Sequence, residues 1–368
     1  MKQGWEYKKI GNICNITTGK LDANAANEDG LYPFFTCSRI PLSINTYAYD
    51  CECILIAGNG DLNVKYYNGK FNAYQRTYIL QLKNDVNGVE MRYIFAFFNL
   101  YIEELRRKSI GGIIKYIKLG DLTNALLPLP DITTQLSIVS ELDKINELIR
   151  LKKEQLKDYD NLAQSIFYEM FGDPVENEKG WEVKKLVEVC SVGTGSTPNR
   201  KNKEYYEHGI YPWVKSTEVC NLPIYSVEEF ITEEALQNTN CGLYPKDSIL
   251  MAMYGQGKTR GQVGLLKIEA CTNQAVAAIV PSKKINSIFL YRHLMLMYEH
   301  IRDMARGGNQ ANLNLTIVRS IQILLPPLPL QHLFAQRIEQ IERQKSAVQK
   351  SITDLETLLA SRMQYWFE

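Results

Sequence analysis

An internal repeat constrains the fold of this chain more than any other feature of its sequence. The run from Gly4 to Gly19 returns as Gly180 to Gly195, with Trp, Glu, two Lys and a Cys at matching positions 176 residues apart. The segment Gln135 to Phe171 returns in similar form as Gln331 to Phe367, at an offset of 196. Solenoid repeats have periods of roughly 20 to 50 residues, so each copy here is expected to be a whole domain.

Composition is that of an ordinary globular protein. The chain has 368 residues, of which 45% are hydrophobic and 23% charged, which is enough apolar material for two cores. No apolar run reaches the roughly 18 residues of a membrane span, and no charged-then-apolar leader precedes Trp5. We therefore expect a cytoplasmic protein with no membrane partner.

The eight cysteines indicate neither a disulfide framework nor a metal site. They are scattered, and a chain of this length does not need disulfides to fold. Only Cys51 and Cys53 lie close together, and no CxxC pair or His cluster has the spacing of zinc ligands. We predict no metal and no bound cofactor.

The net charge of +1 hides an uneven distribution. Residues 1–130 carry 15 Lys and Arg against 12 Asp and Glu, and residues 178–330 carry 17 against 14. Residues 131–177 carry 5 against 10. Two mildly basic modules are thus joined by an acidic segment. This is weak evidence for nucleic-acid binding, because such proteins usually show a clearer basic footprint.

Two long helices are predicted from the positions of proline and glycine. Neither residue occurs between Pro130 and Gly172, and neither follows Pro329. Both segments place apolar residues alternately four and three apart over more than four heptads, which is the coiled-coil period. The expected helix-pairing residues are Ile138, Leu142, Ile145, Ile149 and Leu156 in the first segment, and Phe334, Ile338, Ile341, Val348, Ile352 and Leu355 in the second.

Each apolar stripe has two possible explanations: the helix packs on its own module, or the two helices pair with each other. Each helix spans nearly 40 residues, about 57 Å at 1.5 Å per residue, which is longer than one side of a compact module. Lys152 and Lys345 interrupt the stripes near their middles, and one polar seam position is a known device for fixing register. Both observations favour pairing.

Within the modules the pattern alternates between strand and helix, so each module is predicted to be α+β. Strand-like runs cover Cys53–Ala57, Thr77–Leu82, Ser248–Met253 and Ala275–Val280, and amphipathic helices cover Met91–Lys108 and Ser287–Arg306. The predicted parts are a first module over residues 1–131, a helix within 132–176, a second module over 177–329 and a helix within 330–368.

Polar residues gather in paired loops, where binding groups usually lie. The stretch Gly195–Lys203 combines flexibility, donors and positive charge, whereas its counterpart Gly19–Asn24 is less basic. A second pair is Gly58–Tyr67 and Gly255–Gly261. The third pair is the amide-rich stretch Gly307–Asn312 and its partner in the first module, Gly111–Lys115, which ends in a cation. Loops that differ in this way should read different sequences.

The second loop of the second module contains Gly257-Lys258-Thr259, which is part of a nucleotide-binding P-loop motif. The full motif requires a glycine where Ala252 stands, so we do not expect ATP there. Instead, Lys258 and Arg260 can neutralise phosphates or read guanine. Gln256 or Gln274 can pair with adenine. A solvated hairpin with no binding role remains the alternative for any single residue.

The candidate DNA-binding residues share an amide, hydroxyl, phenol or cation in or beside these loops. They are Lys20, Asn24, Asn59, Lys65, Tyr66, Arg76 and Lys115 in the first module, and Thr197, Asn199, Arg200, Lys201, Lys203, Gln256, Lys258, Thr259, Arg260, Gln274, Asn309, Gln310 and Asn312 in the second.

The order of module, proline cluster and long helix, repeated once, resembles the specificity subunit of type I restriction-modification enzymes over essentially the whole chain. Three motifs carry the resemblance: Pro326–Gln331, Glu169–Pro174 and the run 193–206 that leads into Tyr211–Ser216. The first proline cluster departs from the pattern, because four residues separate Pro130 from the following glutamine where the second cluster has one.

The resemblance implies that each module reads one half of a bipartite site in double-stranded DNA. It also implies that the helices pack as an antiparallel coiled coil and that the subunit is not itself an enzyme. Its implied partners are two adenine methylation subunits, which carry the methyl donor, and restriction subunits, which use ATP. A scaffold or decoy subunit that binds methylation subunits without reading DNA is the alternative, and the cationic and amide-rich loops favour DNA reading.

Overall fold

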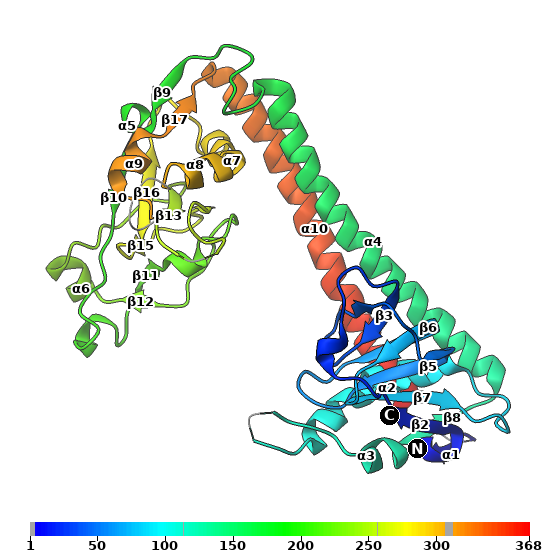
Figure 1. Cartoon of the computed structure of the whole chain (residues 1–368). Helices are drawn as coiled ribbons and strands as arrows, with labels where there is room; N and C mark the ends of the chain where they lie inside the picture. The colour runs from blue at the N-terminus through cyan, green and yellow to red at the C-terminus, as the bar shows by residue number, and fades with distance from the viewer. Residues whose placement is uncertain (1–3, 113, 256, 306–311) are drawn as a thin grey trace. The chain divides into compact units, whose positions relative to one another are not determined.

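The computed structural model describes residues 4–112, 114–255, 257–305 and 312–368 (Figure 1). These residues form two compact units. Unit 1 comprises residues 1–154 and 349–368, and unit 2 comprises residues 155–348. Each unit contains one α+β module and parts of two long helices, so the predicted fold class is confirmed. The residue limits predicted for the four parts stay a prediction.

The first module contains a short ribbon and a six-stranded sheet. β1 pairs with β8, and the sheet has the order β2-β7-β5-β6-β3-β4. Its strands are β1 (Glu6–Lys9), β2 (Cys14–Thr18), β3 (Tyr32–Phe35), β4 (Leu42–Ile44), β5 (Tyr49–Ala57), β6 (Val64–Ala73), β7 (Thr77–Leu82) and β8 (Leu126–Leu129). Its helices are α1 (Ile10–Ile13), the 3-10 turn η1 (Ala23–Ala25), α2 (Met91–Lys108) and α3 (Leu119–Thr123).

The sheet of the first module is buried on both faces. Ile54 and Ile56 of β5 belong to the main core, which α2 covers, because alternate residues of a strand point to opposite faces. Cys53 and Leu55 point the other way, into a smaller cluster with Phe71. The run predicted from Cys53 to Ala57 is therefore the buried end of a longer strand, β5.

The second module uses shorter elements. Its strands are β9 (Val183–Lys185), β10 (Cys190–Thr194), β11 (Tyr211–Val214), β12 (Phe230–Ile231), β13 (Ile249–Ala252), β14 (Val263–Leu265), β15 (Cys271–Thr272), β16 (Val276–Pro281) and β17 (Gln322–Leu324). Its helical segments are α5 (Leu186–Val189), η2 (Lys203–Tyr205), η3 (Ser216–Glu218), α6 (Glu233–Asn238), α7 (Ser287–Leu296), α8 (Tyr298–Asp303) and α9 (Leu315–Ser320).

The two modules share one topology, as the sequence repeat predicts. The order β2-β7-β5-β6 in the first corresponds to β10-β16-β13-β14 in the second, and the β1-β8 ribbon corresponds to β9-β17. The long β6 also runs parallel to β3 and so joins all six strands into one sheet. In the second module two short strands, β14 and β15, take its place, and β15 pairs with β11 in a separate sheet.

The single helix predicted for Ser287–Arg306 is wrong. The structure has two helices, α7 and α8, which meet at Met297, where the backbone ψ angle is 7°. This angle departs from the helical value near −42°, and no glycine or proline signals the break in the sequence. The second helix carries Tyr298 and Arg302, which contact the loop that precedes β14.

A buried glutamine in the first turn of each long helix fastens the helix to its module. The amide nitrogen of Gln135 donates to the carbonyl of Pro130 at 2.8 Å, and its oxygen accepts from the Glu90 amide at 2.9 Å. Gln331 donates to Pro326 at 2.7 Å and accepts from an amide 45 residues earlier. Pro130 therefore corresponds to Pro326, so the apparent departure of the first proline cluster disappears.

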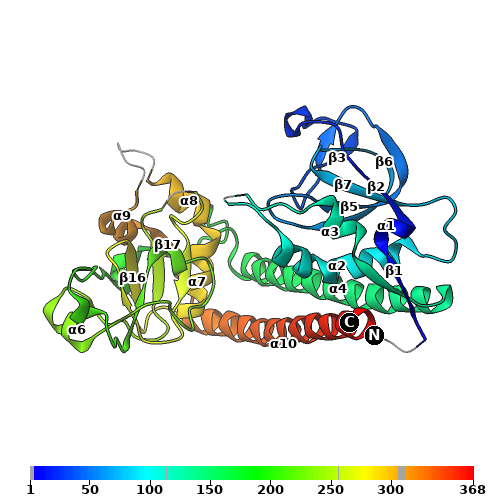
Figure 2. The same ribbon diagram turned by 90° about the horizontal axis from the view of Figure 1, so that it is seen from below.

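The long helices α4 (Ile132–Phe171) and α10 (Leu328–Phe367) lie side by side in both views (Figures 1 and 2). In unit 1, Glu141 accepts hydrogen bonds from Arg362, and Lys153 lies 2.8 Å from Glu356. In unit 2, the seam residue Lys345 lies 2.6 Å from Asp160. Along these pairs the residue numbers on α10 decrease as those on α4 increase, so the helices run antiparallel.

The residues predicted to pair the helices divide between two environments. Ile138 and Leu142 belong to the core of the first module, and Phe334, Ile338 and Ile341 belong to that of the second, so the module-packing explanation holds for the start of each helix. The remaining pairing residues lie outside those cores: Ile145, Ile149, Val348 and Ile352 are buried, and Leu156 and Leu355 are half-buried.

The C-terminal end of each long helix enters a module core. In unit 2, the ring of Phe171 on α4 lies 4.8 Å from that of Phe289 on α7. In unit 1, Phe367 on α10 lies 5.1 Å from Tyr93 on α2. Trp366 stacks on Trp5, with ring centroids 6.2 Å apart and planes 4° from parallel. Each module therefore depends on the end of a helix for part of its core.

His293 on α7 lies fully buried beside these aromatic residues. Its Nε2 accepts a hydrogen bond from the Leu324 amide at 3.1 Å, and its ring packs against Phe167 and Phe289. Among the described residues, its Nδ1 has no hydrogen-bond partner. Burial lowers the pKa of His293 to about 3, an effect that the charge of Asp173 opposes.

We expect this histidine to make unit 2 less stable in mild acid. The unfolded chain binds a proton at His293 below about pH 6.5, whereas the folded chain stays neutral down to about pH 3. The free energy of unfolding should therefore decrease as the pH is lowered through that window, by up to about 1.4 kcal/mol per pH unit. Urea unfolding of the wild type and His293→Gln, at pH 7.5 and 5.5, should show a smaller loss in the variant. Equal losses in the two proteins would contradict this expectation.

Candidate nucleic-acid interface

In the first module, hydrogen bonds bring two of the predicted polar turns together with the turn that carries Arg76. The Gly58 amide donates to the carbonyl of Arg76 at 2.8 Å, and the Gly60 amide donates to that of Lys115 at 3.0 Å. A side chain at Gly58 would not fit, because its Cβ would lie 2.4 Å from the Arg76 oxygen. Arg76 and Lys115 are exposed and Asn59 is half-buried in this cluster.

The loop predicted at Gly19–Asn24 joins the same cluster. The Gly19 amide donates to Thr77 at 3.1 Å, and the Gln75 amide donates to Leu21 at 2.8 Å, so Lys20 and Asn24 lie on a loop fastened beside Arg76. Both of these candidate side chains are exposed. The turns enclose a pocket of about 360 Å³, lined by residues that include Arg76, Tyr116 and Lys118.

Lys65 and Tyr66 lie on β6, and their side chains have different surroundings. Lys65 contacts Asn63, and burial lowers the pKa of its ammonium group. The Tyr66 hydroxyl donates to Glu52 at 2.6 Å, and its ring lies 6.1 Å from that of Phe95 on α2. Burial, followed by the bond to Glu52, raises the pKa of Tyr66 to about 12. The structure does not bring Tyr66 to the turns.

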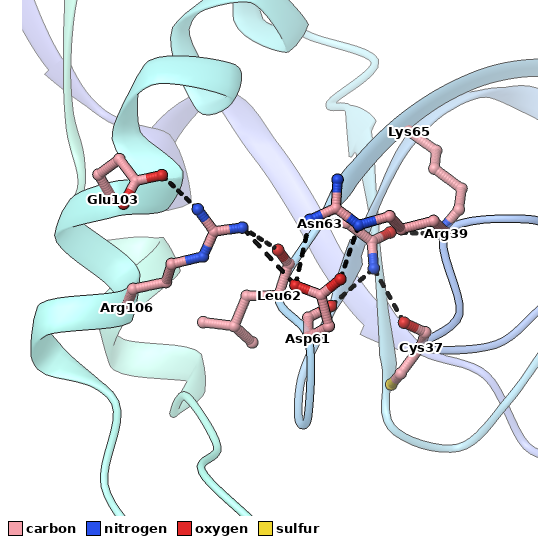
Figure 3. A network of polar contacts seen from close by, with 8 residues as sticks. All are labelled: Cys37, Arg39, Asp61, Leu62, Asn63, Lys65, Glu103 and Arg106. Atoms are coloured by element: carbon pink, nitrogen blue, oxygen red, sulfur yellow. Dashed lines mark hydrogen bonds and ion pairs between the residues drawn. The ribbon is translucent and has the colours of Figure 1, made fainter. Parts of the chain in front are cut away.

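Arg39, in the loop between β3 and β4, adds a group that the sequence did not single out (Figure 3). Its guanidinium donates two hydrogen bonds to the Asp61 carboxylate, and Arg106 of α2 approaches the same carboxylate to 3.8 Å. The bond from Arg39 lowers the pKa of Asp61, so this carboxylate stays ionised. A side-chain hydrogen bond from Asn63 to the Cys37 carbonyl, 2.8 Å long, holds the loop against the turn.

The second module assembles its turns in the same way. The Met253 amide donates to Ala275 at 2.8 Å, which is the counterpart of the bond from Gly58 to Arg76. The Gly195 amide donates to the Thr272 hydroxyl at 3.0 Å, and the Thr197 hydroxyl donates to the exposed Gln274. The ends of β10, β13 and β16 therefore present their loops together.

Arg200 is less available than the sequence suggests. Its guanidinium lies 4.6 Å above the ring of Tyr206 and 4.8 Å from that of Trp213. It also donates to Glu229 at 2.5 Å, and this bond raises the pKa of Arg200. Its position is fixed within the module. The neighbouring candidates Asn199, Lys201 and Lys203 are exposed.

Side chains of α8 hold the Gly257–Gly261 turn by hydrogen bonds to its backbone. The Tyr298 hydroxyl donates to the Lys258 carbonyl at 2.6 Å, and Arg302 donates to the Gly257 carbonyl at 2.8 Å. The backbone is thus fixed while the Lys258 side chain is exposed and Thr259 is half-buried. Arg260 is half-buried, and its Nε has no partner among the described residues.

Strand β14 follows the Gly257–Gly261 turn, in place of the helix that a P-loop would open. Asn312 is half-buried next to Leu313, whose amide donates to Met253 at 3.0 Å, and so it lies near the same turn. Gln256, Asn309 and Gln310 lie outside the described residues.

Charge pairing separates two kinds of cation in these clusters. Arg39, Arg200 and Lys215 are held by carboxylates. Lys203 also lies 3.8 Å from Glu207. Within the described ranges, Lys20, Arg76, Lys115, Lys201 and Lys258 are exposed cations of the turns that form no ion pair. Unpaired, exposed cations can bind phosphates without first breaking a bond within the protein.

Several groups in these clusters escape sequence reasoning. Arg39, Asp61 and Arg106 come from three separated segments, and Lys118 and Glu229 follow no repeat or motif. Only the chain fold brings them to the turns. Over the described part of the chain, no group of His, Cys, Asp and Glu is arranged to hold a metal ion, and no helix is long and apolar enough to cross a membrane.

Comparison with known proteins gives a consistent result. The family described as "Type I restriction modification DNA specificity domain" matches residues 2–158 and 178–357. The Escherichia coli type I restriction enzyme EcoDI specificity subunit is 25% identical over 378 aligned positions, which cover 95% of this chain and 84% of that protein. The MjaIX specificity subunit of Methanocaldococcus jannaschii is also 25% identical, over 74% of this chain and 67% of its own.

Solved structures show the same fold. The type I restriction-modification S subunit of M. genitalium superposes with a TM-score of 0.62 at 15% identity, covering 100% of this chain and 98% of that one. At this level of identity the likeness concerns the arrangement of the chain, two modules and two long helices, and not the residues of the loops.

Proposed function

The chain belongs to the type I restriction-modification DNA specificity family, and from this premise we propose that its two modules read the two halves of a bipartite DNA target. One observation carries the proposal. Each module gathers its polar turns at the ends of equivalent strands, and the turns differ in sequence between the modules. Equivalent frameworks with unlike turns suit a target with two unlike halves.

The unpaired cations and the neutral polar side chains of the turns suit different contacts with DNA. Lys20, Lys115 and Lys258, which are exposed, suit phosphates, and phosphate contacts position a protein without reading sequence. Asn59, Thr197 and Gln274 belong to the same groups of turns, and hydroxyl and amide groups can read base edges. Tyr66 and Arg200 are engaged within their modules, and we assign them supporting roles.

We assign catalysis to partner subunits. The sequence contains no Asn-Pro-Pro-aromatic run for amino methylation and no complete Walker A motif. Adenine methylation subunits are the proposed primary partners, and restriction subunits are further ones. Leucines on the outer faces of the long helices support docking there, because exposed apolar side chains often mark protein interfaces. Four of them are between 45% and 47% exposed: Leu148, Leu151, Leu162 and Leu358.

The proposal is tested by expressing the chain with its methylation subunit and mapping modified adenines across the host genome. We expect one motif with two specified ends separated by unspecified bases. The matched control is the methylation subunit expressed alone, which should leave no motif. An assembled complex that methylates without any motif, or not at all, would favour the scaffold alternative.

A further inference from the structure

Arg39 is held in a geometry that serves more than loop stability. Its Nε donates to one oxygen of Asp61 at 2.7 Å, and its Nη2 donates to the other at 3.3 Å. The carboxylate thus occupies the side edge of the planar guanidinium. The Arg39 side chain is nevertheless 69% exposed, so the pair lies at the surface.

The end edge of the same guanidinium remains available. Arginine has five N–H donors in a fixed plane, and Asp61 uses two of them. Among the residues that the structure describes, Nη1 has no hydrogen-bond partner. The end edge, formed by Nη1 and Nη2, matches the O6 and N7 acceptors that guanine presents in the major groove.

The surroundings of the pair suit a negatively charged ligand. Asp61 would repel DNA if it stood alone, but Arg39 and Arg106 both contact it, and Lys65 lies beside Asn63 in the same network (Figure 3). Arg106 also donates to the Leu62 carbonyl at 2.8 Å, which ties the turn to α2.

The pair also belongs to the turn cluster described above. The Cys37 thiol lies 3.6 Å from the Arg76 carbonyl, and the turn that carries Asp61 is bonded to Lys115 through Gly60. Arg39 thus projects from the same group of loops as the exposed cations. Since Asp61 already restricts its rotamers, binding would cost little side-chain entropy.

We propose that Arg39 reads a guanine in the half-site of the first module and that Asp61 is the positioning residue that aims it. The inference rests on the proposed function and adds a base to it. Substitution of Arg39 should therefore alter one base position of one half-site. A pair that served only to hold the loop would instead alter stability and leave every position unchanged.

The experiment uses the full chain assembled with its methylation subunit and compares motifs mapped from modified adenines. Arg39→Ala should make one guanine position of one half-site degenerate, and Arg39→Lys should do the same because it keeps the charge but loses the planar fork. Asp61→Asn should relax that position partially. The control is Arg150→Ala on α4, an exposed arginine that also donates two hydrogen bonds to one carboxylate, that of Glu147, and its motif should be unchanged.

Binding to synthetic duplexes provides a second readout if a variant methylates too weakly to map. The wild type should prefer the mapped guanine over other bases by about 5- to 140-fold, and Arg39→Ala should lose most of that preference. Replacing this guanine by 7-deazaguanine, which lacks the N7 acceptor, should weaken the wild type several-fold and leave Arg39→Ala unaffected. Melting temperatures within a few degrees of the wild type would show that the variants are folded.

The outcomes separate this inference from the proposed function. If the wild-type complex yields no bipartite motif, the proposed function fails. If it yields one, and Arg39→Ala and Arg39→Lys leave every position and the 7-deazaguanine effect unchanged, the assignment of Arg39 alone is overturned. A half-site without guanine on either strand would also overturn it.

Discussion

Exchanging residues 178–325 for the matching module of a relative is expected to replace one half of the methylated motif and leave the other half unchanged. The exchanged segment carries the second set of turns, whereas the first set lies entirely in unit 1. Each mismatched base pair costs about 1–3 kcal/mol, so a new half-site of several bases should abolish methylation at the original sites.

The packing of unit 2 sets a condition on this exchange. The donor module must accept the retained ends of the long helices, where Phe171 and Phe334 pack against Phe289. A donor with an aromatic residue at that position and an arginine able to reach Glu342, as Arg292 does at 2.5 Å, should dock without repacking. A chimera carrying only the donor's 195–206 loop is the control, and it should alter fewer positions. Changes in both halves of the motif would contradict independent readers.

Inserting four helix-favouring residues into both long helices, after Glu154 and after Val348, is expected to lengthen the unspecified spacer. On α4 the insertion lies between Lys153 and Asp160, and on α10 it lies between Lys345 and Glu356, so each falls between the same two ion pairs. Four residues add about 6 Å. Because each base pair rises about 3.4 Å, the spacer should grow by one or two base pairs, less any bending of the DNA.

The matched control places the same insertion in α4 alone. It shifts α4 past α10 on one side of the insertion, so the two helices lose their register there and assembly should fail. Circular dichroism and co-purification with the methylation subunit would identify that loss. If the double insertion assembles and its mapped motif keeps the original spacer, the helices do not set the distance between the half-sites.

The regular parts of the fold were accessible from sequence because they are periodic. Helix α2 begins and ends where its apolar pattern does, at Met91 and Lys108, and β7 spans the predicted Thr77–Leu82. The repeat gave the shared topology of the modules. The break at Met297 was not accessible, because it lies in the backbone dihedral of an ordinary residue without glycine or proline.

The candidate interface was only partly accessible for a related reason. Loop composition identified the turns at Gly58 and Gly257 but not the contacts that decide which side chains remain free. Arg200 sits in the most basic loop, yet Glu229 and two aromatic rings hold it. Arg39 and Asp61 are 22 residues apart, and only the pairing of their loops makes them neighbours. Such contacts depend on tertiary structure, which no local pattern encodes.

The place of the last helix in the first module has a consequence for how the chain is made. Unit 2 is one continuous stretch, residues 155–348, whereas unit 1 needs residues 349–368 to be complete. Until those residues leave the ribosome, Tyr93 and Phe97 lack Phe367, and Trp5 lacks the ring of Trp366. Domains generally fold from the N-terminus onward during synthesis. Here the module synthesised first is the last to close, and its unfinished core is exposed while the second module is translated and folds.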